Sequence, residues 1–454
     1  MTAVRQNAQQ FSSQAREEDL KGILDFARKA KVETGFGYLN SDGTVDTSRP
    51  VELWITCRMT HVYALAHLQG YEGAAEIAKH GVDSLRGPFH DEEYGGWYSA
   101  ISHELQDLHA VDERKAAYAH AFVVLAASSA TIAGIEGARE LLDQALSNQD
   151  ERWWEAGAEK VYESFDRTFT QTEAYRGVNA NMHTTECYLA AYDATDDEKW
   201  LARALGILQW VIDGQARNNN WRIPEHYDPN WNVIGDYNID KPKDPFRPYG
   251  YTPGHGLEWA RLALHAGSQW AQRHGDAPEW ILPAARALFE QAIADGWHAD
   301  GQDGFVYTND DDGQPVARER MHWVLCEALG AATVLADALA GEGGYTAQQR
   351  AAAMGMEADF DSDRGKNLTL IGEIEEETQD AITQLVKWCD LWWDYAQSYL
   401  IEKPGHWYHE LDHNNQVSTV TWPGKPDAYH VVQCLLLPDL PVAPTFARAL
   451  REAK

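Results

Sequence analysis

Apolar residues recur at helical spacing along most of this chain of 454 residues. In one segment after another, positions i, i+3, i+4 and i+7 are apolar, whereas alternation with a period of two is scarce. This pattern predicts an all-α protein. The expected helices cover residues 17–31, 51–69, 72–86, 111–132, 136–149, 179–194, 197–217, 254–274, 278–297, 319–340, 373–400 and 427–436.

The connections between these helices alternate between short and long. Residues 69–73 and 195–199 form short connections, whereas the long ones are rich in Gly, Asp, Pro and aromatic residues. The long connections at 91–100, 300–313 and 404–416 combine a Gly–aromatic pair with Asp, Asn or Gly, which is typical of a short hairpin. The repeating unit is therefore two helices with a decorated loop, about every 60 to 70 residues.

A helical hairpin of this kind leaves an apolar face unburied until it packs against the next one. Six such units can close into a ring, whereas an open superhelix requires a near-constant period and short loops. We therefore expect an (α/α)6 barrel of six helical hairpins, with the long loops at one mouth and residues 1–454 forming one catalytic domain. Residues 341–372 are rich in Gly, Ala and Asp, and we expect them to be an insertion.

Charge and cysteine content limit the partners. The chain has 70 acidic and 38 basic residues, a formal net charge of −32, which repels nucleic acids and anionic membranes. Because the first twenty residues contain no apolar core of signal-peptide length, we expect a cytoplasmic protein. The five cysteines are scattered without a C-x-x-C pair, which favours buried thiols over disulfides or a zinc site.

Polar side chains recur inside otherwise apolar helices, where burial without a partner is costly. Several are three or four residues apart, so both members of each pair share one helix face. The pairs are Trp54 with Arg58, Asn179 with His183, His255 with Glu258, and Trp323 with Glu327.

Six polar residues also follow the repeat of the whole chain: Arg58, Tyr118, His183, His255, Glu327 and His430. Their separations are 60, 65, 72, 72 and 103 residues, and the last becomes about 70 without the insertion. Residues at the same position of each repeat lie at the same height along the axis of a closed ring. We therefore expect these six groups to converge near one mouth of the ring. Taken singly, each has a structural explanation, since a lone histidine is commonly a core residue and Arg58 has Glu52 nearby as a partner.

Aromatic residues indicate the class of ligand. Flat apolar faces combined with Arg, Asn, His and Glu suit a sugar, which has apolar C–H patches and many hydroxyls. No P-loop is present, and no G-x-G-x-x-G follows a strand, so nucleotide binding is unsupported. We expect a monosaccharide substrate, and a homo-oligomer is possible. The candidate aromatic residues are Trp54, Tyr118, Trp323 and Trp407.

The chain contains, in order, the motifs TGFGYLN (34–40), LWITCRMTHVY (53–63), YGGWYSA (94–100), YRGVNANMH (175–183), YGYTPGHGLEWARL (249–262), DGFVYTNDDDG (303–313), RERMHWVLCEALG (318–330) and PGKPDAYHVVQCLLLP (423–438). Together they resemble the N-acylglucosamine 2-epimerase superfamily, in particular its bacterial aldose–ketose isomerases, which include enzymes acting on D-mannose and sulfoquinovose. The resemblance runs from about Thr34 to Pro444, interrupted by the insertion, which shorter members lack.

The resemblance implies an (α/α)6 barrel, no metal or other cofactor, and two histidines that exchange protons with an open-chain sugar. In this sequence they are His255, in T-P-G-H-x-x-E-W, and His430, in D-x-Y-H. It also implies substrate-binding or supporting roles for Trp54, Arg58, Tyr118, Asn179, His183, Glu258, Trp323 and Glu327.

The implied reaction interconverts D-mannose, and related aldoses such as D-lyxose, with the ketose D-fructose through a cis-enediol. An imidazole suits proton transfer between C2 and C1 because its pKa lies near neutral pH. We expect His255 to move that proton and His430 to open the sugar ring as an acid. Arg58 would stabilise negative charge on the oxygens, and Glu258 would orient His255.

Other functions stay open at this point. A sulfoquinovose–sulfofructose isomerase and a sugar 2-epimerase belong to the same superfamily. An inverting glycoside hydrolase would use carboxylates among Asp303, Glu258 and Glu327. A ring that only binds sugar is a further alternative. A metal-dependent isomerase would draw its ligands from His183, His255, His430, Glu258 and Glu327.

Overall fold

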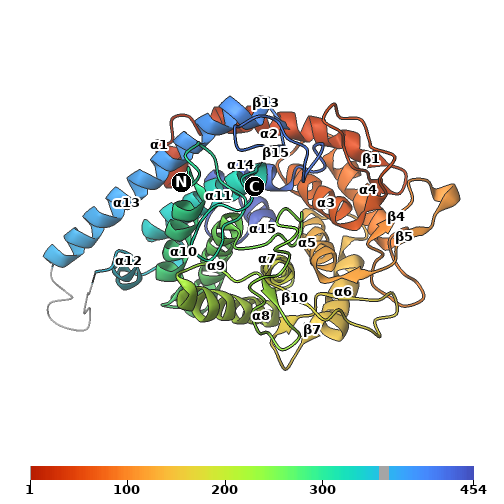
Figure 1. Ribbon diagram of the computed structural model, residues 1–454, viewed down its shortest axis with the longest axis horizontal. Coiled ribbons are helices and arrows are strands. Elements are labelled where there is room, and N and C mark those ends of the chain that lie inside the picture. Colours follow the sequence, from red (N-terminus) through yellow and green to blue (C-terminus); the bar gives the residue numbers. More distant parts are fainter. Residues whose placement is uncertain (1, 357–367) are drawn as a thin grey trace.

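The computed structural model describes residues 2–356 and 368–454, and it is mostly helical (Figure 1). Six of its helices pack against one another in sequence, and the last of them, α14, packs against the first, α3. Most of their residues are buried because neighbouring helices cover them on several sides. We call them the inner helices: α3 (Leu53–Leu68), α5 (Ala117–Ala133), α7 (Val178–Thr195), α9 (Pro253–His274), α11 (His322–Leu339) and α14 (Tyr429–Leu436).

A second helix packs on each inner helix from outside. These outer helices are amphipathic: in α4, Ile77 and Val82 are buried, whereas Glu76 and Asp83 are exposed. They are α4 (Ala74–Arg86) on α3, α6 (Ala138–Asn148) on α5, α8 (Glu198–Leu208) on α7, α10 (Ile281–Gly296) on α9, α13 (Leu368–Tyr395) on α11 and α2 (Ser13–Ala27) on α14.

The contact of α2 with the C-terminal part of the chain joins segments nearly 400 residues apart. Asp19 of α2 accepts hydrogen bonds from Nε1 of Trp407 and from the backbone N–H of Gly405, both at 2.6 Å. Arg16 forms an ion pair with Asp439 at 3.0 Å. The expectation that Trp407 offers a face to a sugar is therefore wrong, because this side chain is fully buried against α2.

Each helix expected from the periodicity is present among the described residues. The segment 111–132 begins its helix only at Ala117, because Ala110–Asp112 (β5) and Lys115–Ala116 (β6) are extended. All five cysteines are buried and free, as expected. Helices that were not expected are short: α1 (Ala3–Asn7), α12 (Ala347–Ala353) and α15 (Phe446–Glu452).

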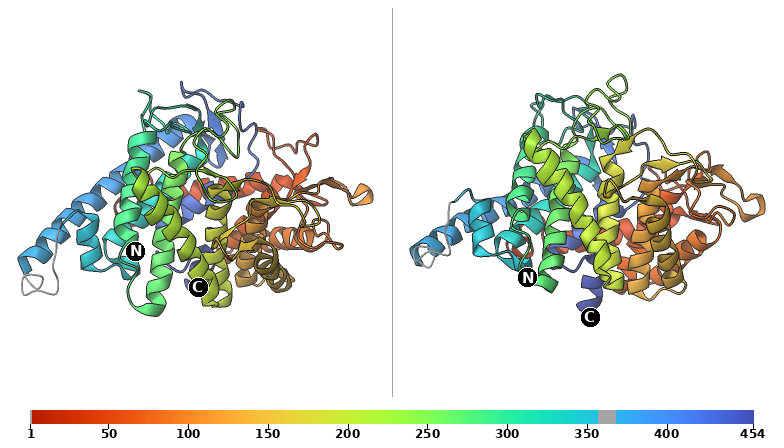
Figure 2. Two further views of the ribbon diagram at one scale, coloured as in Figure 1. Left: turned by 60° about the horizontal axis from the view of Figure 1, so that its bottom comes forward. Right: turned by 90° about the horizontal axis from the view of Figure 1, so that it is seen from below.

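Short strands fix the loops at one end of the molecule. Four strands directly precede inner helices, and each pairs with a strand from a neighbouring long loop. Figure 2 shows these loops gathered at one end, which we call the loop end, while α15 packs at the opposite end. The pairs are β3 (Val51–Glu52) with β4 (Ala100–Ile101), β6 with β9 (Ser164–Phe165), β10 (Arg176–Gly177) with β11 (His226–Tyr227), and β12 (Arg320–Met321) with β15 (Glu410–Leu411).

The hairpins expected in three long connections are present. Residues His90 and Trp97 form an antiparallel bridge, as do Trp297 and Phe305. In the third connection, β13 (Ile401–Lys403) pairs with β14 (His406–Trp407).

The first part of the expected insertion packs against the inner and outer helices. The hydroxyl of Tyr345 donates to the carbonyl of Leu264 in α9 at 2.7 Å, and Gln349 donates to the carbonyl of Ala277 at 2.5 Å. Residues 357–367 of the insertion lie outside the described residues. Figure 1 shows one end of α13 extending away from the other helices.

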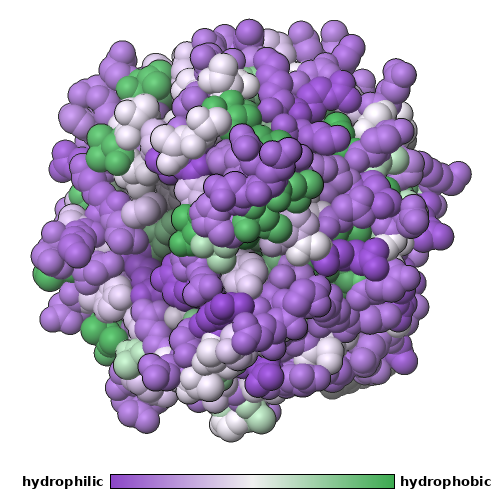
Figure 3. Space-filling view, turned by 90° about the vertical axis from the view of Figure 1, so that its right-hand side faces the viewer, coloured by the Kyte–Doolittle hydropathy of each residue, from purple (hydrophilic) through white to green (hydrophobic). Residues whose placement is uncertain are grey.

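One helix within the described residues, α11, is long and apolar enough to cross a membrane. It is 94% buried inside the molecule and packs against α9 and α13, so its apolar character reflects its place in the core. The face in Figure 3 is mainly hydrophilic, with hydrophobic residues in small groups around a hollow.

Candidate active site

A cavity open to solvent lies among the N-terminal turns of the inner helices, at the loop end, with about 630 Å³ of empty space when its open mouth is included. Phe246, Tyr307 and Trp422 from the loops cover it, and these aromatic residues were not anticipated. Nine of the ten expected site residues line it: Trp54, Arg58, Tyr118, Asn179, His183, His255, Glu258, Trp323 and His430.

The lining residues occupy two levels along the axis, which refines the expectation of one height. The second residue of five inner helices forms the upper level: Trp54, Tyr118, Asn179, Trp323 and His430. Side chains four residues later on a helix share its face one turn deeper. Arg58, His183 and Glu327 take those deeper positions; the first two still reach the cavity, whereas Glu327 is bound to His430 and Arg261 and does not line it.

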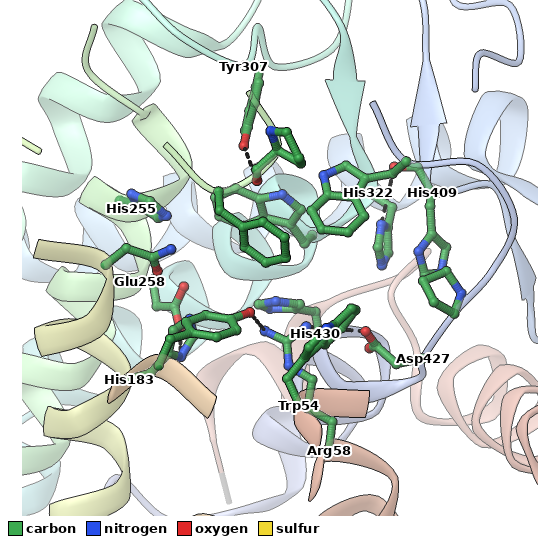
Figure 4. Close-up of a pocket in the computed structure, with 17 residues that line it drawn as sticks. Trp54, Arg58, His183, His255, Glu258, Tyr307, His322, His409, Asp427 and His430 are labelled. Atoms are coloured by element: carbon green, nitrogen blue, oxygen red, sulfur yellow. Dashed lines mark hydrogen bonds and ion pairs between the residues drawn. The ribbon is translucent and has the colours of Figure 1, made fainter. Parts of the chain in front are cut away.

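Two histidines at the cavity are each held by a buried carboxylate. Nδ1 of His255 donates to Oε1 of Glu225, and Nδ1 of His430 donates to Oε1 of Glu327, both at 2.8 Å. Within the described part of the chain, Nε2 of neither ring bonds to a protein group, so both are free to face a ligand. Figure 4 shows both histidines at the cavity, and the ring of Trp323 lies 5.3 Å from that of His255 and 5.7 Å from that of His430.

The carboxylate on His255 is not the one expected. Glu258 was expected to orient His255, but Glu225 makes that contact and Glu258 faces His183. Glu225 comes from the loop segment just before β11, where its carbonyl accepts the N–H of Val178. Helical spacing gave no signal for it, because a loop residue has no fixed phase relative to α9.

Arg261 fixes the carboxylate behind His430. Its Nε and Nη2 both lie 2.9 Å from Oε2 of Glu327. Burial raises the pKa of Glu327, and Arg261 opposes that shift. Burial lowers the pKa of His430 well below its ordinary value, and Arg58 adds to this effect, so His430 is neutral near pH 7.

Arg58 has a different partner from the one suggested by sequence. Its Nη1 lies 3.2 Å from Oδ2 of Asp427, and its Nη2 donates to the hydroxyl of Tyr118 at 3.0 Å. Glu52 instead accepts a hydrogen bond from Nε1 of Trp54. Burial alone would raise the pKa of Asp427, but Arg58 holds it below its ordinary value.

Three groups meet at the floor of the cavity: His183 and Glu258, which line it, and Glu186, which does not. Their ligand atoms lie within 4.8 Å of one another, a spacing and composition that can hold a metal ion. Arg261 already supplies positive charge there, with Nη2 3.8 Å from Oε1 of Glu258. Burial lowers the pKa of His183 to about 4 and raises that of Glu258 well above its ordinary value.

The family model for N-acylglucosamine 2-epimerase (GlcNAc 2-epimerase) matches residues 35–366 and 373–434 of the chain. The chain belongs to the N-acylglucosamine 2-epimerase family. A D-mannose isomerase of Thermobifida fusca is 42% identical over 435 residues, which are 95% of each protein. A D-mannose isomerase of Pseudomonas cannabina pv. alisalensis is 40% identical over 431 residues, 95% of this chain and 93% of that protein.

A solved structure also resembles this N-acylglucosamine 2-epimerase family member. The crystal structure of a D-mannose isomerase matches with a TM-score of 0.75 and 24% identity, covering 93% of this chain and 96% of that one. At this identity the likeness concerns the fold alone.

The carboxylates expected for a glycoside hydrolase do not flank one site in this family member. Asp303 is largely exposed and bonds to His298 at 3.0 Å. Glu327 is occupied by His430 and Arg261, which leaves Glu258 as the one of the three that lines the cavity. Inverting hydrolases need two carboxylates on opposite sides of the substrate.

Two more histidines line the cavity that the sequence had not indicated. The rings of His322 and His409 stack with centroids 3.8 Å apart. His322 is the first residue of α11, and His409 directly precedes β15, the strand that pairs with β12 before α11. A lone histidine at a helix start carries no sequence signal that separates it from a core residue.

Proposed function

We propose that this protein is an aldose–ketose isomerase that interconverts D-mannose, and related aldoses such as D-lyxose, with the corresponding ketose, D-fructose for mannose. The proposal rests on the two carboxylate-bound histidines at one cavity. Two curated relatives, 42% and 40% identical over 95% of the chain, are D-mannose isomerases. We also propose that the inner and outer helices form an (α/α)6 barrel and that residues 1–454 are one catalytic domain.

His255 moves the proton between the carbon atoms in this proposal. Its free Nε2 takes the proton from C2 of the open-chain sugar, which leaves an enediolate, and returns it to C1 after a proton has moved from O2 to O1. The imidazolium formed in between is stabilised by Glu225 at Nδ1. The same face of the enediol loses and gains the proton.

His430 serves the oxygen atoms. Because burial keeps its ring neutral, Nε2 begins as a proton acceptor and takes the proton of the anomeric hydroxyl. As the bond between C1 and the ring oxygen O5 breaks, the protonated imidazole acts as the expected acid and gives that proton to O5. The neutral imidazole then takes the proton of the O2 hydroxyl and gives it to O1. Arg58 lines the cavity and stabilises negative charge that develops on these oxygens.

The cavity favours an uncharged sugar over sulfoquinovose. Arg58 is the one Lys or Arg among the described lining residues, and it is already bound to Asp427. A sulfonate would have no free cation there, and a buried unpaired anion is costly. The net charge of −32 also opposes the approach of an anion.

A sugar 2-epimerase is the second candidate, because two histidines line the same cavity and an epimerase needs proton donors on two faces of the sugar. Incubating the protein with D-mannose and identifying the product separates the two. Fructose as the main early product supports the isomerase, and glucose without fructose would overturn it. The cytoplasmic location and a homo-oligomer stay predictions.

A further inference from the structure

The stacked pair His322 and His409 forms the wall of the cavity opposite His255. Figure 4 shows His255 and Glu258 on one side of the cavity and His322 and His409 on the other. Both rings are buried, with 5% of each residue exposed, yet both line the cavity. The mechanism proposed above uses neither of them. Burying two imidazoles side by side at a ligand cavity calls for a ligand that they contact.

The proton positions of His322 follow from its partner. Its Nδ1 lies 3.3 Å from the backbone oxygen of His409, and a carbonyl only accepts, so Nδ1 carries the hydrogen. Nε2 of His322 is therefore a hydrogen-bond acceptor. Among the described residues no protein group bonds to the ring nitrogens of His409, so that ring offers a donor as well as an acceptor.

Both rings are neutral at the pH of a cell. Burial lowers the pKa of His322 to about 4, although Asp427 opposes this shift. Burial lowers the pKa of His409 well below its ordinary value, and the neighbouring His322 adds to the effect. Arg58 and Lys425 act in the same direction on His409. A neutral acceptor beside a neutral donor suits a hydroxyl group, which donates and accepts, and does not suit an anionic oxygen.

The position of the pair selects one part of the sugar. The reacting atoms C1 and C2 must lie within reach of His255 and His430, and the ring of His322 lies 6.4 Å from that of His430, farther from His255. The remainder of the sugar chain therefore extends toward the stacked pair.

We propose that His322 and His409 bind the C6 hydroxyl of the aldose and thereby restrict the substrate to sugars that are uncharged at C6. This proposal rests on the isomerase function proposed above and adds the residues that determine specificity. The pair acts on binding and on orientation, since it lies away from the carbon atoms that exchange a proton.

The test compares D-mannose with 6-deoxy-D-mannose, which lacks only the C6 hydroxyl. One hydrogen bond between uncharged groups corresponds to about a 3- to 10-fold effect. The wild-type protein should therefore have a kcat/KM for D-mannose that is at least about 3- to 10-fold higher than its kcat/KM for 6-deoxy-D-mannose.

Three variants show whether His409 makes this hydrogen bond. His409→Phe, which keeps the stacked ring and removes its nitrogens, should reduce the ratio of the two kcat/KM values toward one. His409→Gln, which keeps a donor and an acceptor, should retain most of it. His413→Phe, in the exposed turn nearby, is the matched control.

Each outcome decides a separate point. Equal kcat/KM for the two sugars in the wild-type protein would overturn this proposal whether or not the variants fold. Equal losses on both sugars in folded His409→Phe would show a structural role and would overturn it as well. Turnover of sulfoquinovose at a rate comparable to D-mannose would contradict the restriction to uncharged sugars. Failure of the wild-type protein to form any ketose from D-mannose would instead overturn the proposed function, and this proposal with it.

Discussion

Glu327 accepts a hydrogen bond from Nδ1 of His430 at 2.8 Å, while Arg261 binds its other oxygen at 2.9 Å. The chain places these three residues on α11, α14 and α9, so three inner helices determine the orientation of one imidazole. A ring held at Nδ1 presents Nε2 to the cavity in a fixed tautomer, which is what repeated proton transfer requires.

Glu327→Gln should lower kcat about 10- to 100-fold, because the amide supports the imidazolium less well and disturbs Arg261. His430→Ala should lower it by at least about 10² to 10⁴, as loss of an acid–base group does. When Glu327→Gln is added to His430→Ala, kcat should fall little further, because Glu327 acts through the imidazole that His430→Ala has already removed. Steady-state kinetics of both single variants and of the double variant measure this, with Glu290→Gln on the surface as control. Independent, fully additive losses would contradict the positioning role.

The contact between Glu225 and His255 predicts a difference between two glutamates. Glu225→Gln should lower kcat about 10- to 100-fold, because the amide supports the His255 imidazolium less well. In His255→Ala the same change should add little, since it acts through that ring, whereas Glu258→Gln should lower kcat further because Glu258 faces His183 instead. A full further loss from Glu225→Gln and none from Glu258→Gln would restore the pairing expected from helical spacing.

The sequence was informative where the signal is periodic. The inner and outer helices follow from spacing along helices, and so do nine of the seventeen lining residues, because position on a helix determines which way a side chain points. Glu225 and His409 were not predicted, since each comes from a loop segment whose path depends on distant pairing, as between β12 and β15. The start of α5 was placed too early because Ala110–Asp112 has a composition that suits a helix as well as a strand.

Asp337 predicts a pH-dependent stability far from the cavity. Burial raises its pKa to about 7 from 3.8, and its Oδ1 accepts the N–H of Ala3 at 2.9 Å. The folded protein holds this proton between those pH values and the unfolded chain does not, so the free energy of unfolding falls as pH rises. Asp337→Asn keeps the hydrogen-bond acceptor but has no proton to lose. As pH rises from 4 to 8, its free energy of unfolding should therefore increase by about 2 to 4 kcal/mol relative to that of the wild-type protein. Urea denaturation across this range measures it, and a constant difference would contradict the shifted pKa.

The contacts of residues 341–356 predict how the insertion tolerates replacement. Exchanging all of 341–372 for a Gly/Ser linker should lower the free energy of unfolding, because Tyr345 and Gln349 lose their bonds to α9 and to Ala277. Exchanging only 357–367 should leave those bonds in place and stability close to wild type. Thermal melts of the two variants test this. Equal stability of both would show that these contacts contribute little.

The proton transfer by His255 is tested most directly by running the reaction of D-mannose in deuterated water, with a chelator present, and locating the label by NMR. A histidine that takes the C2 proton exchanges it in part with solvent, so we expect fructose that carries deuterium at C1. We also expect the chelator to leave the rate of fructose formation unchanged. Fructose that retains the whole C2 hydrogen at C1, with no deuterium there and with activity lost to the chelator, would contradict it.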